Sequence, residues 1–132
     1  MLEIALALIW RRGCLLLARR LPDAHLGGCW EFPGGKIGPG ETAWECARRE
    51  AMEELGVTCE PLEVLPAIEH HYPDRCVRLI PVACRYEGGP PRAVQAAEWR
   101  WVHPSQLGAY SMPEANAALV RRLAGKGRNG EI

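Results

Sequence analysis

Residues 30–57, WEFPGGKIGPGETAWECARREAMEELGV, hold the pattern that decides the fold. A glycine-rich segment comes first, and Thr42 then opens a helix, because Glu45 follows at the spacing of a capping box. We predict a helix over residues 42–55 that ends at Gly56, since glycine readily adopts the left-handed conformation that closes a helix. The stretch therefore predicts a loop, a helix and a second loop in immediate succession.

Acidic residues gather on one side of this helix. Glu50, Glu53 and Glu54 share an arc of about 100° at 3.6 residues per turn. Beside them runs the apolar stripe expected to face the core: Trp44, Ala47, Ala51 and Leu55. The acids are either a solvated face or a partly buried cluster that a divalent cation would stabilise. Oxygen ligands without Cys or His favour Mg²⁺, with Mn²⁺ as a possible substitute, over zinc.

The spacing of the fixed residues in this region decides between the two interpretations. Gly35, Glu41, Arg49-Glu50, Glu53-Glu54 and Gly56 stand in one register. This pattern resembles the Nudix box, G-x5-E-x7-R-E-U-x-E-E-x-G-U with U aliphatic, although Ala51 is small for its position. A motif of this length is specific. The resemblance implies an α/β (α+β) Nudix fold, a mixed β-sheet sandwiched between α-helices, which hydrolyses nucleoside diphosphates linked to another moiety.

The resemblance also implies roles for the residues of the box. Glu50, Glu53 and Glu54 match the family's metal-binding acids, and the carbonyl of Gly34 often adds a ligand. Arg49 would pair with a neighbouring carboxylate and hold its side chain in place. Glu41 matches the first acid of the box, and the sequence leaves open whether it acts on water or only orders the loop.

Residues outside the box resemble the MutT-type 8-oxo-dGTP diphosphatases within this family. The matching segments are 19–20, 23–25, 30–37, 72–75 and 112–116. In that branch Asn116 and the backbone beside Phe32 would read the oxidised guanine, while Arg20 and Lys36 would face the phosphates. From the residues alone, Asn116 could equally be a helix cap, Phe32 a core aromatic, and the two cations surface charges.

One position departs from the MutT pattern. Those enzymes have a further acid in the loop before the last strand, and an ungapped count places Gln95 there. The nearest carboxylates are Glu98 and then Glu87. The proton acceptor is therefore expected to be Glu50 or a displaced Glu98.

These features predict a Mg²⁺-dependent nucleoside triphosphate pyrophosphohydrolase that converts 8-oxo-dGTP to the monophosphate and pyrophosphate. One alternative is a Nudix pyrophosphatase for undamaged dNTP, CTP or dinucleoside polyphosphates. Another, of a different class, is a catalytically silent nucleotide-reading module. The complete set of acids argues against the silent module.

Length and composition limit what else the chain could be. Its 132 residues predict one domain over 1–125 and a flexible tail over 126–132. A formal net charge of +0 argues against a nucleic-acid polymer as partner, and no apolar run is long enough to span a membrane. Six cysteines without a CxxC pair fit reduced thiols in a cytoplasmic protein. The sequence does not define the oligomeric state, and a monomer is favoured.

Hydrophobic patterning outside the helix predicts mainly strands. A hairpin is expected over 2–9 and 14–19, and a loop over 21–30 precedes an extended piece at 30–32 and a break at 33–35. Further strands are expected near 58–71, 76–86 and 98–102, with Trp99 and Trp101 on one face. A short helical turn at 104–108 and a second helix over 114–124 complete the prediction.

Overall fold

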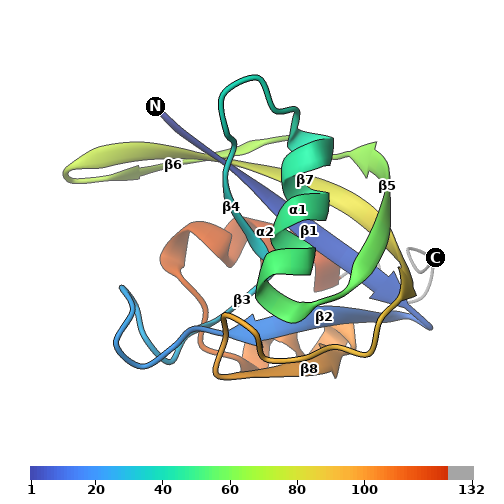
Figure 1. The fold of residues 1–132 in the computed structure, drawn as a ribbon. Helices are drawn as coiled ribbons and strands as arrows, with labels where there is room; N and C mark the ends of the chain where they lie inside the picture. The colour runs from blue at the N-terminus through green and yellow to red at the C-terminus, as the bar shows by residue number, and fades with distance from the viewer. Residues whose placement is uncertain (125–132) are drawn as a thin grey trace.

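A mixed β-sheet lies between two helices in the computed structural model of the protein, which describes residues 1–124 (Figure 1). The tail predicted for 126–132 lies outside these residues. The strands are β1 Leu2–Arg11, β2 Cys14–Arg19, β3 Trp30–Glu31, β4 Gly34–Lys36, β5 Thr58–Val64, β6 Ile68–Tyr72, β7 Arg75–Gly88 and β8 Glu98–Val102. The helices are α1 Ala43–Leu55 and α2 Ala117–Ala124, with 3₁₀ helices η1 Pro104–Ala109 and η2 Glu114–Asn116.

Strand β1 is the centre of the sheet. It runs parallel to β7 along most of its length, and antiparallel to β2 at one end and to β4 at the other. Its side chains alternate between the two faces, as the pleat of a strand requires. Leu6 and Leu8 join one hydrophobic cluster, whereas Ala7 and Ile9 join the other. Because both faces are buried, the strand is apolar almost throughout.

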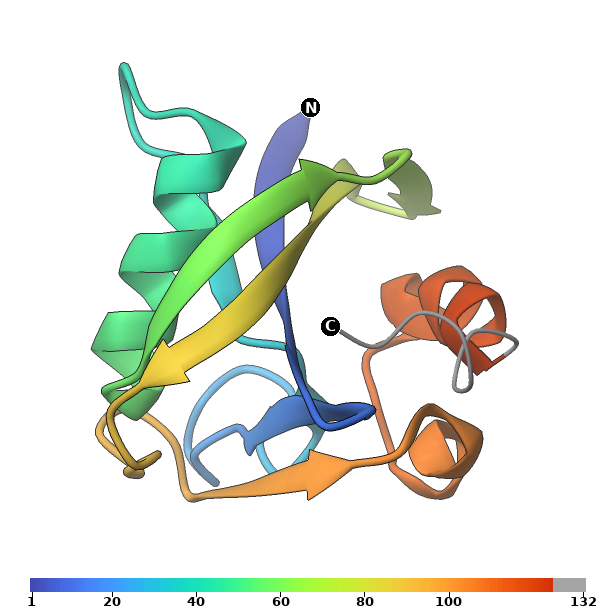
Figure 2. The same cartoon turned by 90° about the vertical axis from the view of Figure 1, so that its right-hand side faces the viewer.

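Each helix covers one of these faces. Helix α1 packs over the cluster that contains Ala7 and Ile9, while α2 and η1 pack over the cluster that contains Leu6 and Leu8. Figure 2 shows the sheet between the two layers. The predicted mixed sheet between helices is therefore confirmed. No helix among residues 1–124 is long and apolar enough to cross a membrane.

Several local predictions are confirmed. The hairpin of β1 and β2 turns at Arg12 and Gly13, both with positive φ. Trp99 and Trp101 both pack against the cluster beneath α1, as two residues on one face of a strand should. Helix α1 begins after Thr42 and ends at Gly56, within a residue of the predicted bounds.

Other predictions were wrong in detail. The break expected at 33–35 overlaps the short strand β4, and the stretch 58–71 is two strands, β5 and β6. The helix predicted over 114–124 begins as the 3₁₀ turn η2. Trp44, expected in the apolar stripe of α1, is 41% exposed. Its place in the first turn leaves it at the surface, while Ala43 packs against the core instead.

Candidate active site

The sequence at its two ends fixes helix α1 in place. The Thr42 hydroxyl accepts a hydrogen bond from the Glu45 N–H at 3.1 Å, and the Glu45 carboxylate accepts one from the Thr42 N–H at 2.9 Å. At the other end Gly56 has φ 66°, the left-handed conformation that a side chain would strain. Both ends of the acidic helix are thus defined by local bonding.

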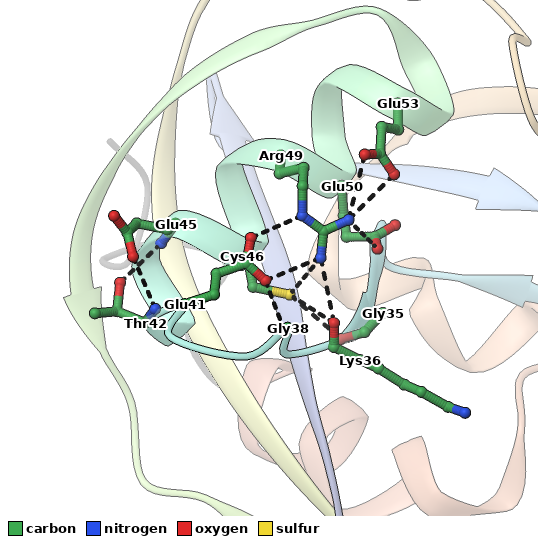
Figure 3. Close-up of polar contacts among 10 residues, drawn as sticks. All are labelled: Gly35, Lys36, Gly38, Glu41, Thr42, Glu45, Cys46, Arg49, Glu50 and Glu53. Atoms are coloured by element: carbon green, nitrogen blue, oxygen red, sulfur yellow. Dashed lines mark hydrogen bonds and ion pairs between the residues drawn. The ribbon is translucent and has the colours of Figure 1, made fainter.

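Arg49 lies at the centre of the carboxylates of the box, as Figure 3 shows. Its guanidinium binds Glu41 through two N–H groups at 2.7 and 3.0 Å. It also donates to Glu50 at 3.0 Å and to Glu53 at 3.2 Å. The predicted pairing of Arg49 with neighbouring acids is present, and it joins three carboxylates to one cation.

Glu41 ties the loop before α1 to this helix. Besides binding Arg49, its carboxylate accepts the Gly38 N–H at 2.8 Å. The bonds from Arg49 and Gly38 lower the pKa of Glu41 to about 2. The carboxylate is therefore charged at neutral pH and engaged in ordering the loop, one of the two roles left open by the sequence.

Glycines let strand β4 pass close to the helix acids. A side chain at Gly35 would place its Cβ 2.4 Å from the Glu50 carboxylate, so the glycine lets this acid lie close to the backbone of β4. The Gly34 N–H donates to Glu54 at 3.0 Å. The Cys46 thiol, fully buried, donates to the Gly35 carbonyl at 3.4 Å. The carboxylates of Glu50 and Glu54 therefore lie against the backbone of β4.

Burial distinguishes Glu54 from the other acids of the helix. The residue is 7% exposed. Loss of hydration is the largest cause that raises the pKa of Glu54 to about 9, and the nearby charge of Glu31 is the second. The hydrogen bond from the Gly34 N–H lowers this pKa. Burial also raises the pKa of Glu31. A cluster of buried acids is costly to ionise without an added positive charge.

The residues of this cluster suit a divalent metal by their chemistry. Glu50, Glu53, Glu54 and the Gly34 carbonyl offer oxygen only, the ligand type of a hard cation. Among residues 1–124, no three acidic, His or Cys side chains are arranged as a ready-made metal site. Instead, Arg49 forms ion pairs with the carboxylates of Glu50 and Glu53. A metal ion bound by these two acids would therefore compete with both ion pairs.

A cavity of about 690 Å³ opens on the other side of β4. Its volume lies in the range of small-molecule sites. The wall nearest the acids is formed by Gly34, Gly35 and Lys36. Aliphatic side chains of β1 and β7 line its floor: Leu2, Ile4, Leu6, Val77 and Leu79. The metal-binding candidates and the cavity therefore share one short strand.

The two cations predicted to face phosphates both line this cavity. Arg20 binds Glu31 at 2.8 Å and donates to the His25 carbonyl at 2.6 Å. Lys36 is exposed, and its side chain extends away from the box (Figure 3). No ion pair joins Lys36 to another described residue.

The two residues predicted to read the base also reach the cavity. Phe32 is fully buried and belongs to the core, which agrees with its alternative interpretation as a core aromatic. Asn116 is 4% exposed, and no hydrogen bond joins its side-chain amide to another group within residues 1–124. The amide is therefore not engaged as a helix cap. The structure brings Arg20, Phe32, Gly34, Lys36 and Asn116 to one cavity.

Glu98 is not among these residues. It lies on β8 and pairs with Arg19 at 2.9 Å and with Arg100 at 3.7 Å. Gln95 lies nearer the acids, because its N–H donates to the Glu54 carbonyl at 3.0 Å. The loop has thus not shifted to bring Glu98 to the position where the family pattern has an acid.

Two cavity residues were assigned no role from the sequence. Glu31 binds Arg20 and lies close enough to Glu54 to raise its pKa. An acid between Trp30 and Phe32 was the available signal, since charged residues seldom lie between two core aromatics. Tyr72 also lines the cavity, and its segment 72–75 matched the MutT pattern without indicating a role for this side chain.

The fold and the site together define an α/β protein in which an acidic helix and a ligand-sized cavity both lie against strand β4. The chain belongs to the Nudix family, because the family model described as NUDIX domain matches residues 5–122. It is 33% identical to the 8-oxo-dGTP diphosphatase of Escherichia coli (strain K12), over 92% of this chain and 95% of that protein.

Two further proteins show the range of this family. The chain is 29% identical to the CTP pyrophosphohydrolase of Escherichia coli (strain K12), over 91% of this chain and 89% of that protein. The crystal structure of the MutT protein from Methanosarcina mazei Go1 has a TM-score of 0.83 and 26% identity, and covers 97% of this chain and 96% of that chain. The chain is therefore a MutT-type Nudix pyrophosphohydrolase, and its relatives differ in substrate.

Proposed function

We propose that the chain hydrolyses 8-oxo-dGTP to its monophosphate and pyrophosphate with Mg²⁺. One observation is the main support: a single cavity joins Asn116 and Phe32 to strand β4, behind which lie Glu50 and Glu54. A nucleotide with its base at Asn116 would extend its phosphates toward Lys36 and the box. The similarity to an 8-oxo-dGTP diphosphatase supports the same substrate.

Nudix hydrolases generally use divalent metals such as Mg²⁺. In this chain Glu50, Glu53, Glu54 and the Gly34 carbonyl would hold the ion, with Mn²⁺ as a possible substitute. When bound, the ion would neutralise phosphate oxygens and lower the pKa of the attacking water. The raised pKa of Glu54 supports this proposal, because a buried carboxylate needs a positive partner to ionise.

The remaining roles follow from the contacts of each side chain. Glu50 would accept the proton of the attacking water, since its carboxylate lies against β4 beside the cavity. Lys36 and Arg20 would stabilise negative charge on the phosphates. Arg49 and Glu41 would support these groups by ordering the loop and the acids. Glu98 remains a second candidate base, which would first have to leave Arg19 and Arg100.

Asn116 would provide selectivity for the oxidised base. A primary amide has both donors and an acceptor, so it can form two hydrogen bonds with one purine edge. Oxidation of guanine at C8 turns N7 from an acceptor into a donor. An amide oxygen placed there would favour the oxidised base, and the backbone beside Phe32 would complete the contact.

A second candidate substrate is CTP or another undamaged nucleoside triphosphate. A relative named CTP pyrophosphohydrolase matches nearly the same span of the chain at 29% identity. Base choice depends on a few contacts in the cavity, whereas the box is common to both activities. Dinucleoside polyphosphates are a further alternative that the same box would serve.

A panel of nucleotides tests these substrates. The purified protein is assayed with Mg²⁺ on 8-oxo-dGTP, dGTP, CTP and a dinucleoside polyphosphate, with the monophosphate and pyrophosphate both quantified. We expect the highest kcat/KM for 8-oxo-dGTP and a kcat lowered by roughly 10²–10⁴ in Glu50→Gln. A higher kcat/KM for CTP would replace the first candidate by the second, and release of inorganic phosphate alone would contradict both.

The same proposal takes residues 1–125 as one domain that acts as a monomer in the cytoplasm, with a small nucleotide and no nucleic-acid polymer as its partner. The two hydrophobic clusters on either side of one sheet support a single folding unit. Sedimentation analysis of the purified protein tests the monomer, and a truncation after residue 125 that keeps full activity tests the domain limit.

A further inference from the structure

We propose that Tyr72 is a positioning residue that holds Asn116 in the orientation needed to select the base. The inference rests on the proposed role of Asn116. Tyr72 ends strand β6, whereas Asn116 lies in the segment before α2, so two segments far apart in the chain each form a wall of the same cavity.

One hydrogen bond joins the two walls. The Tyr72 hydroxyl accepts the N–H of Ala115 at 3.3 Å, a partly buried contact between residues 43 positions apart. Ala115 directly precedes Asn116, and both are buried. A displacement of the backbone at Ala115 is therefore passed to Asn116 through one peptide unit, which is planar and stiff.

The start of η2 lacks an ordinary cap, and this explains why the contact matters. The first N–H groups of a helix have no partner within the helix and normally bind a capping side chain. Pro113 occupies the capping position and makes no such bond. The Asn116 N–H reaches the Pro113 carbonyl at 2.9 Å. The N–H of Ala115 is bound instead by Tyr72, which acts as a cap supplied from another strand.

The ring of Tyr72 is itself fixed. It meets the ring of His70 edge to face, with centroids 4.5 Å apart, and it packs against the core cluster that contains Phe32. A ring held on two sides presents its hydroxyl at a defined point. Tyr72 therefore sets the distance between the β6–β7 wall and the segment that contains Asn116.

Removing only the hydroxyl tests this inference. Tyr72→Phe keeps the ring and deletes the bond to Ala115. Tyr86→Phe is the matched control, because it deletes a 2.8 Å bond from its hydroxyl to the Gly89 carbonyl, away from the residues that line the cavity. With 8-oxo-dGTP and dGTP as substrates, we expect Tyr72→Phe to lower the ratio of the two kcat/KM values by roughly three- to tenfold. The change should appear in KM, since chemistry at the box is untouched. Tyr86→Phe should leave the ratio unchanged.

A double-mutant cycle shows whether the effect passes through Asn116. In the Asn116→Ala background, Tyr72→Phe should produce no further change in the ratio. An equal effect in both backgrounds would overturn the inference, as would an unchanged ratio in Tyr72→Phe alone. If the wild-type protein does not prefer 8-oxo-dGTP, the proposed substrate fails together with this inference. A wild-type preference that Tyr72→Phe leaves intact overturns this inference alone.

Discussion

At the scale of single residues, burial divides the acids of the box into different physical situations. The Glu53 side chain is 44% exposed and paired with Arg49, and the Glu50 side chain is 15% exposed against β4. Glu54 is buried among other acids. Their positions in the box suggested one shared role as metal ligands. Because their exposure differs, the free energy of ionising the carboxylate differs from one acid to the next. The consequences for stability and turnover should therefore differ as well.

Glu53→Gln should abolish turnover and leave the fold intact. The carboxylate is solvated, and exposed ion pairs such as that with Arg49 contribute about 0–1 kcal/mol. The melting temperature without metal should therefore change little. The stabilisation produced by Mg²⁺ should fall, because a ligand stabilises the native state less when it binds that state more weakly. Thermal unfolding with and without Mg²⁺, together with kcat, provides the measurement, and an unchanged kcat would remove Glu53 from the metal site.

Glu54→Gln should stabilise the metal-free protein at high pH. The folded-state pKa of Glu54 is raised to about 9, compared with about 4.3 for an unperturbed glutamate. Because the folded state binds this proton more tightly, its contribution to stability is complete below about pH 4.3 and is lost as the pH rises toward 9. Glutamine has no proton to lose. Urea unfolding in chelator from pH 5 to 9 should show a decline for the wild type that Glu54→Gln reduces and Glu53→Gln does not.

Glu98→Gln should change kcat by less than about tenfold, whereas Glu50→Gln should lower it by roughly 10²–10⁴, the range for a general base. The Glu98 carboxylate already binds Arg19 and Arg100, and lies outside the cavity lining. Steady-state kinetics on the best substrate compares the two variants. If Glu98→Gln lowered kcat as much as Glu50→Gln, the loop before β8 would have to move during turnover. Glu98 would then again be the candidate general base.

At the scale of elements, the sequence predicted best where local bonding decides the structure. Helix α1 was predicted within a residue because its capping box and Gly56 act through neighbouring residues. Strand β4 was missed because Gly34 and Gly35 have no strand preference of their own, and the strand exists only through pairing with β1. The exposure of Trp44 likewise depends on how far the core extends beneath the first turn.

Thr42→Ala should destabilise the fold by about 0.5–2 kcal/mol. The change deletes the hydroxyl that accepts the Glu45 N–H, whereas the bond from the backbone N–H of residue 42 to the Glu45 carboxylate can remain. The acids lie on later turns of α1, so kcat under folding conditions should be nearly unchanged. Urea unfolding and a kinetic assay on the same preparation measure both quantities. Thr42→Ser, which keeps the hydroxyl, is the control and should recover most of the stability.

At the scale of the whole molecule, the cavity is assembled from segments far apart in the chain. Arg20, Phe32 and Lys36 come from the N-terminal third, whereas Asn116 comes from the other end. Similarity to the MutT pattern predicted that these residues bind the substrate. That they line one cavity could be seen only from the folded sheet, which brings their segments together. The bond between Tyr72 and Ala115 was not predictable, because it depends on how two remote segments are brought together.

Asn116→Ala should lower kcat/KM for 8-oxo-dGTP much more than for dGTP. Asn116 is 4% exposed and its side-chain amide makes no hydrogen bond within residues 1–124, so the amide is available to a ligand in the cavity. A buried polar group left without its partner costs about 1–3 kcal/mol, which corresponds to a preference of roughly 5- to 150-fold for the base that satisfies it. The substitution removes this discrimination and does not touch the carboxylates of α1, so Mg²⁺-induced stabilisation should persist. The measurement is the ratio of the two kcat/KM values in wild type and variant. A large wild-type ratio that Asn116→Ala leaves unchanged would assign selectivity to the backbone beside Phe32, while a wild-type ratio near one would favour the undamaged nucleotide as substrate.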